Sequence, residues 1–165
     1  MPDVSVHRPP WGILLPMRLT LAHIGAKFSA KEGYEELTAL YLARCAPFAR
    51  CLAETFRTED ALLQWLDRQQ GRTPVVVVLL DNLGREMTSE GFAHWLGGQR
   101  DSGAQHIVFA IGPASGWSDP TRKRATLLLS LGQMTMAHAL ARVVIAEQIY
   151  RAFTILTGHP YHSGH

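Results

Sequence analysis

The sequence predicts an α/β domain in which a mostly parallel β-sheet is flanked by helices. Segments with strand character alternate with segments of helical spacing along the 165 residues. Two of the strand segments, within residues 73–84 and 106–112, contain unbroken apolar runs with no polar face. Such runs are typical of strands that are covered on both faces, as they are in parallel sheets built from βαβ units.

The first half of the chain predicts two strands and two helices. Residues 17–25 form the first strand, because Leu19 and Leu21 alternate with small or polar residues until Gly25. Apolar residues at helical spacing, acidic residues early and a basic residue late predict a helix over 29–45. A short strand over 51–56 and a helix over 58–71 follow, the latter capped by Thr58 and stopped by Gly71.

The second half continues the alternation. The elements expected, in order, are a strand at 73–84, a helix at 88–100, a strand at 106–112, a short helix at 119–125, a strand at 126–132 and a helix at 137–156. In the short helix, Asp119 is the expected N-cap and Pro120 the first helical residue. The last helix is too apolar for a solvent-exposed helix, so it either fills the core or forms a dimer interface.

Bulk properties exclude several classes of protein. The net charge is only +2, which does not argue for a dedicated nucleic-acid binder. Two cysteines, Cys45 and Cys51, are expected to be reduced thiols. No apolar stretch approaches a membrane span or a signal peptide, so we expect a cytoplasmic protein. Residues 1–16, with four prolines, are expected to be a flexible N-terminal extension before a single domain over 17–165.

Three glycine-containing loops follow predicted strands, at residues 80–84, 111–116 and 131–136. Ligands of open parallel sheets bind at the carboxyl ends of strands, where glycine lets the backbone approach them closely. Taken singly, each loop is better interpreted as an ordinary β–α turn, but three such loops at one edge of the sheet favour a ligand site. None matches a phosphate-binding loop or a dinucleotide fingerprint, so a ligand held by backbone groups and apolar contacts is favoured.

Polar residues interrupt the long helix. His138 and Arg142 share one face, and Glu147 and Arg151 have the spacing of a helical ion pair. The arginines are interpreted as structural partners or as part of a site for an anionic substrate. The basic residues 122–124, with Arg100, either contact nucleic-acid phosphates or form a solvated face.

The chain ends in TGHPYHSGH. A metal site formed by His159, His162 and His165 would lack a rigid support, a carboxylate and a cysteine, so a metal-dependent hydrolase is disfavoured and no metal is expected. Gly158 is expected to end the long helix, and Pro160 to direct the chain away from it.

The residues SLGQMTMAHALARVVIAEQIYRAFTILTGHPYH resemble the C-terminal signature of the RlmH family. These proteins are 23S rRNA (pseudouridine-1915-N3)-methyltransferases of the SPOUT superfamily. LLDNLGREMTSEGFA, FAIGPASG and MRLTLAHIG resemble three further motifs of the family, so the resemblance runs from Met17 to His162.

The resemblance implies a SPOUT-type α/β fold with a C-terminal trefoil knot, a homodimer, S-adenosyl-L-methionine as methyl donor and 23S rRNA in the assembled ribosome as substrate. It also implies cofactor contacts from all three strand-end loops. By resemblance these contacts are Leu80, Gly112, Leu131, Gly132, Gln133, Met134, Thr135 and Met136.

For catalysis, the resemblance suggests that Arg142 orients the base or stabilises its anion, and that Tyr161 and His162 contact the nucleotide. Neutral His162 is a candidate proton acceptor, with solvent as the alternative, whereas His138 is expected to be structural. Two positions depart from the family: Pro113 replaces a glycine, and Ala137 replaces a proline. Since proline has no N–H to donate, a catalytically weak or inactive ribosome-binding dimer of the same fold is the alternative.

Overall fold

Five parallel strands form one sheet in the order β2-β1-β4-β3-β5. The computed structural model describes residues 17–27, 29–69 and 71–164. In chain order the strands are β1 (Arg18–Ile24), β2 (Arg50–Phe56), β3 (Val76–Glu86), β4 (His106–Ile111) and β5 (Leu127–Ser130). Each pairing between neighbouring strands is parallel, which confirms the predicted fold class. The strand order does not by itself specify a knot, and the trefoil knot stays a prediction.

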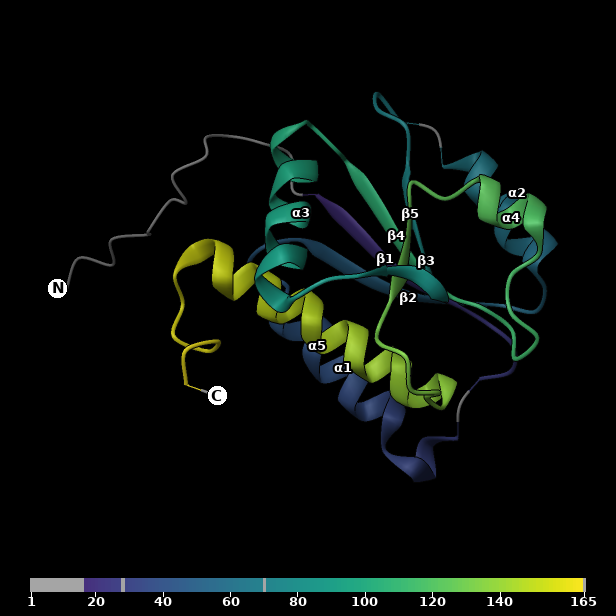
Figure 1. Cartoon of the computed structure of the whole chain (residues 1–165), viewed down its shortest axis with the longest axis horizontal. Coiled ribbons are helices and arrows are strands. Elements are labelled where there is room, and N and C mark those ends of the chain that lie inside the picture. The colour runs from purple at the N-terminus through teal and green to yellow at the C-terminus, as the bar shows by residue number, and fades with distance from the viewer. Residues whose placement is uncertain (1–16, 28, 70, 165) are drawn as a thin grey trace, which may run out of the picture.

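Helices cover both faces of the sheet (Figure 1). The helices on one face are α1 (Tyr34–Arg44), α3 (Ser89–Asp101) and α5 (His138–Thr157), with α5 packed against both of the others. On the other face lie α2 (Glu59–Arg68) and α4 (Asp119–Lys123). The core is therefore divided by the sheet into two apolar clusters, one for each face.

Strand β1 is buried on both faces. Leu19 and Leu21 belong to the cluster beneath α1, α3 and α5, whereas Ala22 and Ile24 belong to the cluster beneath α2. The alternation in this segment therefore separates side chains that pack in one apolar cluster from side chains that pack in the other. It does not separate a buried face from a solvated one, because β2 and β4 flank β1 and helices cover it above and below.

Two predicted helix starts were wrong in detail. The helix expected over 29–45 is divided, because Gly33 at φ +77° separates a short 3-10 helix (Ala30–Glu32) from α1. The N-cap of α4 is Ser118 rather than Asp119, which is the first helical residue. The reason is tertiary: Glu59 of α2 accepts hydrogen bonds from the backbone N–H and the hydroxyl of Ser118.

The long helix α5 fills the core of the domain, which is one of the two alternatives that its apolar sequence left open. Ten of its 20 residues are buried. The helix ends at Gly158, which confirms that prediction. None of the helices in the described part of the chain has the length and apolar character needed to cross a bilayer. The expected flexible extension, residues 1–16, lies outside the described residues.

A buried histidine at the start of β4 makes the fold sensitive to acid. Arg18 Nη2 lies 3.1 Å from His106 Nδ1, and Thr20 Oγ1 lies 2.8 Å from Nε2. Because an arginine can only donate, Nδ1 accepts, and the ring is the neutral tautomer that carries its proton on Nε2. Burial, with the nearby charge of Arg18, lowers the pKa of His106 to about 4.

We expect the free energy of unfolding to fall as the pH is lowered from about 6.5 to about 4. The unfolded chain binds a proton at His106 in this window while the folded chain does not, so acid favours unfolding, by at most roughly 3 kcal/mol. Urea titrations at several pH values measure this. His106→Asn should flatten the profile above pH 4, and parallel profiles for variant and wild type would contradict the assignment.

Candidate functional site

A cavity of about 370 Å³ opens where β3 becomes irregular after Leu80 and at the carboxyl ends of β4 and β5. It lies where ligand sites of open parallel sheets are expected. The structure brings together in its lining all the residues expected to contact the cofactor, from three separate loops. These residues are Leu80, Gly112, Leu131, Gly132, Gln133, Met134, Thr135 and Met136.

The wall formed by β3 depends on an irregularity in the strand. Leu80 and Arg85 both pair with Leu129 of β5, so residues 81–84 loop out of the sheet between them. The Asp81 carboxylate stabilises this loop by accepting a hydrogen bond from the Leu83 amide at 2.9 Å. The chain returns through Gly84, where a Cβ would lie 2.6 Å from the backbone of β5, so only glycine fits.

The wall formed by the loop after β4 depends on a second close approach. A Cβ on Gly112 would lie 2.7 Å from the indole ring of Trp117, which is 5% exposed. The same indole N–H donates a hydrogen bond of 2.9 Å to the Leu80 carbonyl. Gly112, Trp117 and Leu80 are therefore one packing unit that joins two of the strand ends.

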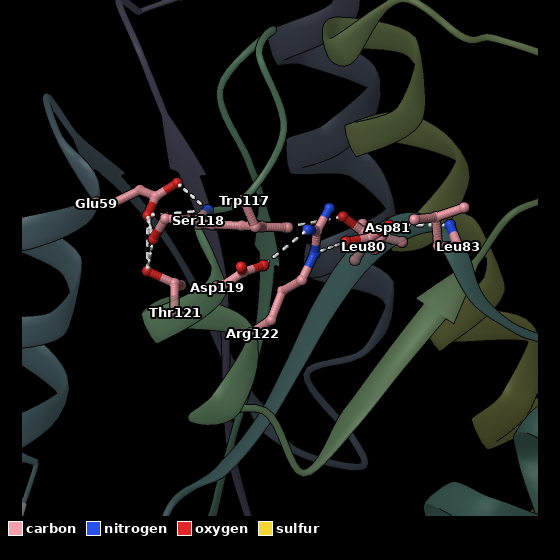
Figure 2. A network of polar contacts seen from close by, with 9 residues as sticks. All are labelled: Glu59, Leu80, Asp81, Leu83, Trp117, Ser118, Asp119, Thr121 and Arg122. Carbon is pink, nitrogen blue, oxygen red and sulfur yellow. Dashed lines mark hydrogen bonds and ion pairs between the residues drawn. The ribbon is translucent and has the colours of Figure 1, made fainter.

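The charged residues of the cavity include an ion pair (Figure 2). Arg122 Nε lies 2.8 Å from Asp81 Oδ2, and the Asp81 side chain is only 2% exposed. Although burial opposes ionisation, hydrogen bonds from the Leu83 amide and Arg122 hold the pKa of Asp81 below its usual range. The carboxylate raises the pKa of Arg122 in turn.

Asp81 lies within one of the three predicted loops but was given no role, and Trp117 and Arg122 were not predicted as residues of the site. Asp81 directly follows Leu80 at a strand end, which was a usable signal. Arg122 was interpreted as a contact to phosphates or as part of a solvated helix face. Nothing in the local pattern connects Trp117 with a residue 37 positions earlier.

Arg142 lies in different surroundings. Its side chain is 4% exposed and forms an ion pair with Glu35 of α1. It lines a cavity between α1 and β2, whereas His138, one helical turn earlier, lines the cavity at the strand ends. Within one chain, the structure therefore does not bring Arg142 together with the expected cofactor contacts.

Tyr161 and His162 fold back onto the C-terminal half of α5. Glu147 accepts a hydrogen bond of 3.0 Å from the Tyr161 hydroxyl and one of 2.6 Å from Arg151, which confirms the predicted Glu147–Arg151 ion pair. Burial and the hydrogen bond to Glu147 raise the pKa of Tyr161, so the phenol stays protonated at neutral pH. Neither tail residue is part of the cavity lining at the strand ends.

His162 is bonded through both ring nitrogens. Arg151 Nη1 lies 3.1 Å from Nδ1, and Glu90 Oε1 of α3 lies 2.8 Å from Nε2. Since arginine donates, Nδ1 accepts and Nε2 carries the proton. The lone pair that would make His162 a base is therefore occupied by Arg151 in this arrangement.

The basic residues are mostly paired. Arg122 contacts Asp81, Arg124 contacts Asp67 and Arg100 contacts Asp101. Their contact with rRNA phosphates stays a prediction. Among the described residues, no group of three or more histidine, cysteine or acidic side chains could hold a metal ion, and His165 lies outside them.

Comparison with known proteins assigns the family. A family model described as a predicted SPOUT methyltransferase matches residues 17–162. A ribosomal RNA large subunit methyltransferase H from Paramagnetospirillum magneticum is 56% identical over 156 residues, which cover 88% of this chain and 99% of the relative. One from Koribacter versatilis is 46% identical over 90% of this chain and its own whole length. The chain belongs to the RlmH family of SPOUT methyltransferases.

Solved structures show the same fold outside the RlmH family. The SpoU methyltransferase AviRb from Streptomyces viridochromogenes superposes with a TM-score of 0.52 at 12% identity, over 88% of this chain. The chain spans 63% of the length of AviRb. A second AviRb structure, with a TM-score of 0.50 at 13% identity, is a complex with AdoMet. At this identity the likeness concerns the SPOUT fold alone.

Proposed function

We propose that this RlmH-family chain transfers a methyl group from S-adenosyl-L-methionine to N3 of a pseudouridine, of the position 1915 type, in 23S rRNA on the assembled ribosome. The observation that carries the proposal is the cavity in which eight residues from three loops meet. The same eight residues are the cofactor contacts implied by the family motifs. Relatives that bear the large-subunit rRNA methyltransferase name match along their whole length.

The cavity suits S-adenosyl-L-methionine in size and chemistry. Its volume of about 370 Å³ lies within the range of small-molecule sites. Leu80, Leu131 and Met134 offer apolar contacts, and Gly112 lies in the same lining with its Cα packed against Trp117. When bound, the cofactor supplies an electrophilic methyl group carried on its sulfonium.

The acceptor nitrogen is a weakly acidic imide, so its proton must leave before or during the transfer. We assign Tyr161 and His162 to the nucleotide. Protonated Tyr161 is a hydrogen-bond donor once its hydroxyl releases Glu147, which lies 3.0 Å away, and His162 is a contact and candidate base. To accept the proton at Nδ1, His162 must first release Arg151, which lies 3.1 Å from that atom. Solvent is the alternative acceptor of the proton.

Arg142 retains its proposed role in stabilising the imide anion, although it lines a separate cavity of a single chain. A buried guanidinium stabilises a nearby anion more than an exposed one does, since little water screens its charge. In this role it would act on a nucleotide that approaches from the side of α1 or across a dimer.

A homodimer is proposed because apolar side chains are exposed in the cavity lining and at positions next to lining residues along the chain. Met134 is 90% exposed and Leu83 is 77% exposed, and Leu140 at the start of α5 is 42% exposed. Apolar surface of this kind is typical of an interface. Sedimentation equilibrium distinguishes one chain from two. Because the substrate is a ribosome, we propose that the protein acts in the cytoplasm.

The test is methyl transfer from labelled cofactor to ribosomes from a strain that lacks the modification. We expect label in 23S rRNA of intact ribosomes and much less in naked rRNA. Labelling of neither substrate would rule out the proposed activity. Equal labelling of both would show that methyl transfer does not require the assembled ribosome.

The alternative is a ribosome-binding dimer without catalysis. Pro113 favours it, because this residue offers no amide N–H to a cofactor. Titration calorimetry separates the two proposals: S-adenosylhomocysteine should release heat with an enzyme and none with an inactive binder.

A further inference from the structure

We propose that Trp117, Asp81 and Arg122 are positioning residues that hold the loop after β4 against the end of β3. In this way they set the spacing of the backbone atoms that bind the cofactor. The inference rests on the proposed function, because it assigns new roles within the same cavity. The three residues and their partners are drawn in Figure 2.

The first attachment joins backbone to side chain. Trp117 donates from its indole nitrogen to the Leu80 carbonyl at 2.9 Å, and its ring leaves no room for a Cβ on Gly112. Leu80 lies in β3 and Gly112 directly follows β4, and both are expected cofactor contacts. The buried indole therefore links these two contacts beyond the point where the pairing of Leu80 with Ile111 ends.

The second attachment is ionic and involves the next residue of β3. Asp81 accepts from Arg122 Nε at 2.8 Å with one carboxylate oxygen and from the Leu83 amide at 2.9 Å with the other. Both oxygens are thus used inside the protein, which favours a structural task over direct contact with a ligand. Asp119 Oδ1, at 3.5 Å from Arg122 Nη1, further restricts the guanidinium.

A third attachment secures the opposite side of the loop. Glu59 of α2 accepts from the Ser118 hydroxyl at 2.6 Å and from the Thr121 hydroxyl at 2.7 Å. The start of α4 is therefore held between α2 and β3, as Figure 2 shows. Residues 113–116 line the cavity, and both ends of this segment are held in place, by Gly112 at one end and by the start of α4 at the other.

Pro113 explains why such attachments matter in this chain. Gly116 N–H donates to the Pro113 carbonyl at 2.9 Å and closes a turn, but the proline itself has no N–H to donate. A loop with fewer backbone donors depends more on side chains at its ends to keep one conformation. Binding sites whose supporting residues are removed lose affinity because their geometry loosens by small distances.

The test measures the dissociation constant of S-adenosylhomocysteine by calorimetry on the full chain. Asp81→Asn, Arg122→Gln and Trp117→Phe should each raise it roughly tenfold, since each removes one attachment and keeps most of the side-chain volume. Arg122→Lys should restore part of the affinity. The matched control is Asp67→Asn, which removes an equally short ion pair of 2.8 Å to Arg124, just after α4 and away from the cavity. It should change the constant less than twofold.

A second ligand separates positioning from direct contact. 5′-Methylthioadenosine lacks the amino-acid part of the cofactor, and a loosened backbone should weaken both ligands alike. Loss confined to S-adenosylhomocysteine would mean that Arg122 touches the amino-acid carboxylate, and it would overturn the positioning role.

Two further results would also overturn the inference. One is a lower melting temperature with unchanged affinity for both ligands, which would show that the three residues contribute to stability and not to the geometry of the cavity. The other is weaker ribosome binding alone, which would make Arg122 a phosphate contact. A wild-type chain that binds neither ligand would instead contradict the proposed function itself, so the two failures are distinguishable.

Discussion

Replacing His162 by alanine is expected to lower kcat by about a hundredfold while the dissociation constant of S-adenosylhomocysteine changes less than twofold. The size is that of losing a residue that contacts the reacting group or takes its proton. The affinity is preserved because His162 lies outside the lining of the cavity at the strand ends. It belongs to the tail after α5, where it contacts Arg151 and Glu90. Single-turnover methylation and calorimetry measure the two quantities separately.

His159→Ala is the matched control for this variant. His159 lies in the same tail and is exposed, and its ring accepts a hydrogen bond from the Tyr161 amide at 3.2 Å. It should change kcat by less than about threefold. If His162→Ala weakened cofactor binding and left kcat intact, the tail would contact the cofactor and not the nucleotide. Equal losses of kcat in both variants, together with bound zinc, would support the metal site that the sequence disfavours.

Replacing Gly112 by alanine is expected to weaken S-adenosylhomocysteine binding by about a hundredfold or more. The new Cβ would lie 2.7 Å from the buried ring of Trp117, so the ring or the loop must move. Either movement displaces a proposed cofactor contact and disturbs the hydrogen bond from Trp117 to Leu80, and displacements of about 1 Å can cost two orders of magnitude. Calorimetry measures the affinity.

Gly98→Ala provides the comparison at a helical glycine. Nothing lies within 4 Å of a Cβ at that position in α3, so alanine should leave cofactor affinity unchanged. It should also raise the free energy of unfolding by about 0.5–1 kcal/mol, because glycine is a poor helix former. Wild-type affinity in Gly112→Ala would show that the loop after β4 can move aside, and that the cofactor does not depend on this wall.

The strand ends were accessible from the sequence because their signals are local. The apolar runs that lead into Leu80 and Ile111 show where the strands are buried, and glycine marks the loops that follow. In a parallel sheet the loops after the strands lie along one edge of the sheet. The sequence alone therefore predicts that Gly112 lies close to the loop that contains Gly132. The family motifs then added the nature of the ligand.

Other parts of the site could not be predicted in this way. Helical spacing puts His138 and Arg142 on one face of α5, yet one lines the cavity and the other pairs with Glu35 of α1. Spacing along a helix tells which residues are neighbours, but it does not tell which element covers each of them. The N-cap of α4 was wrong for the same reason, since Glu59 of α2 binds Ser118.

The sequence by itself determined the alternation of strands and helices, the parallel sheet and the loops that contain the proposed cofactor contacts. Each of these follows from burial or backbone preference within a short segment. Only the tertiary structure decided the strand order that brings β3 beside β4, the attachment of Arg122 to Asp81 and the contact of His162 with Glu90. These pairs are separated by 41 and 72 residues, and packing of whole elements, rather than any local pattern, determines which distant side chains meet.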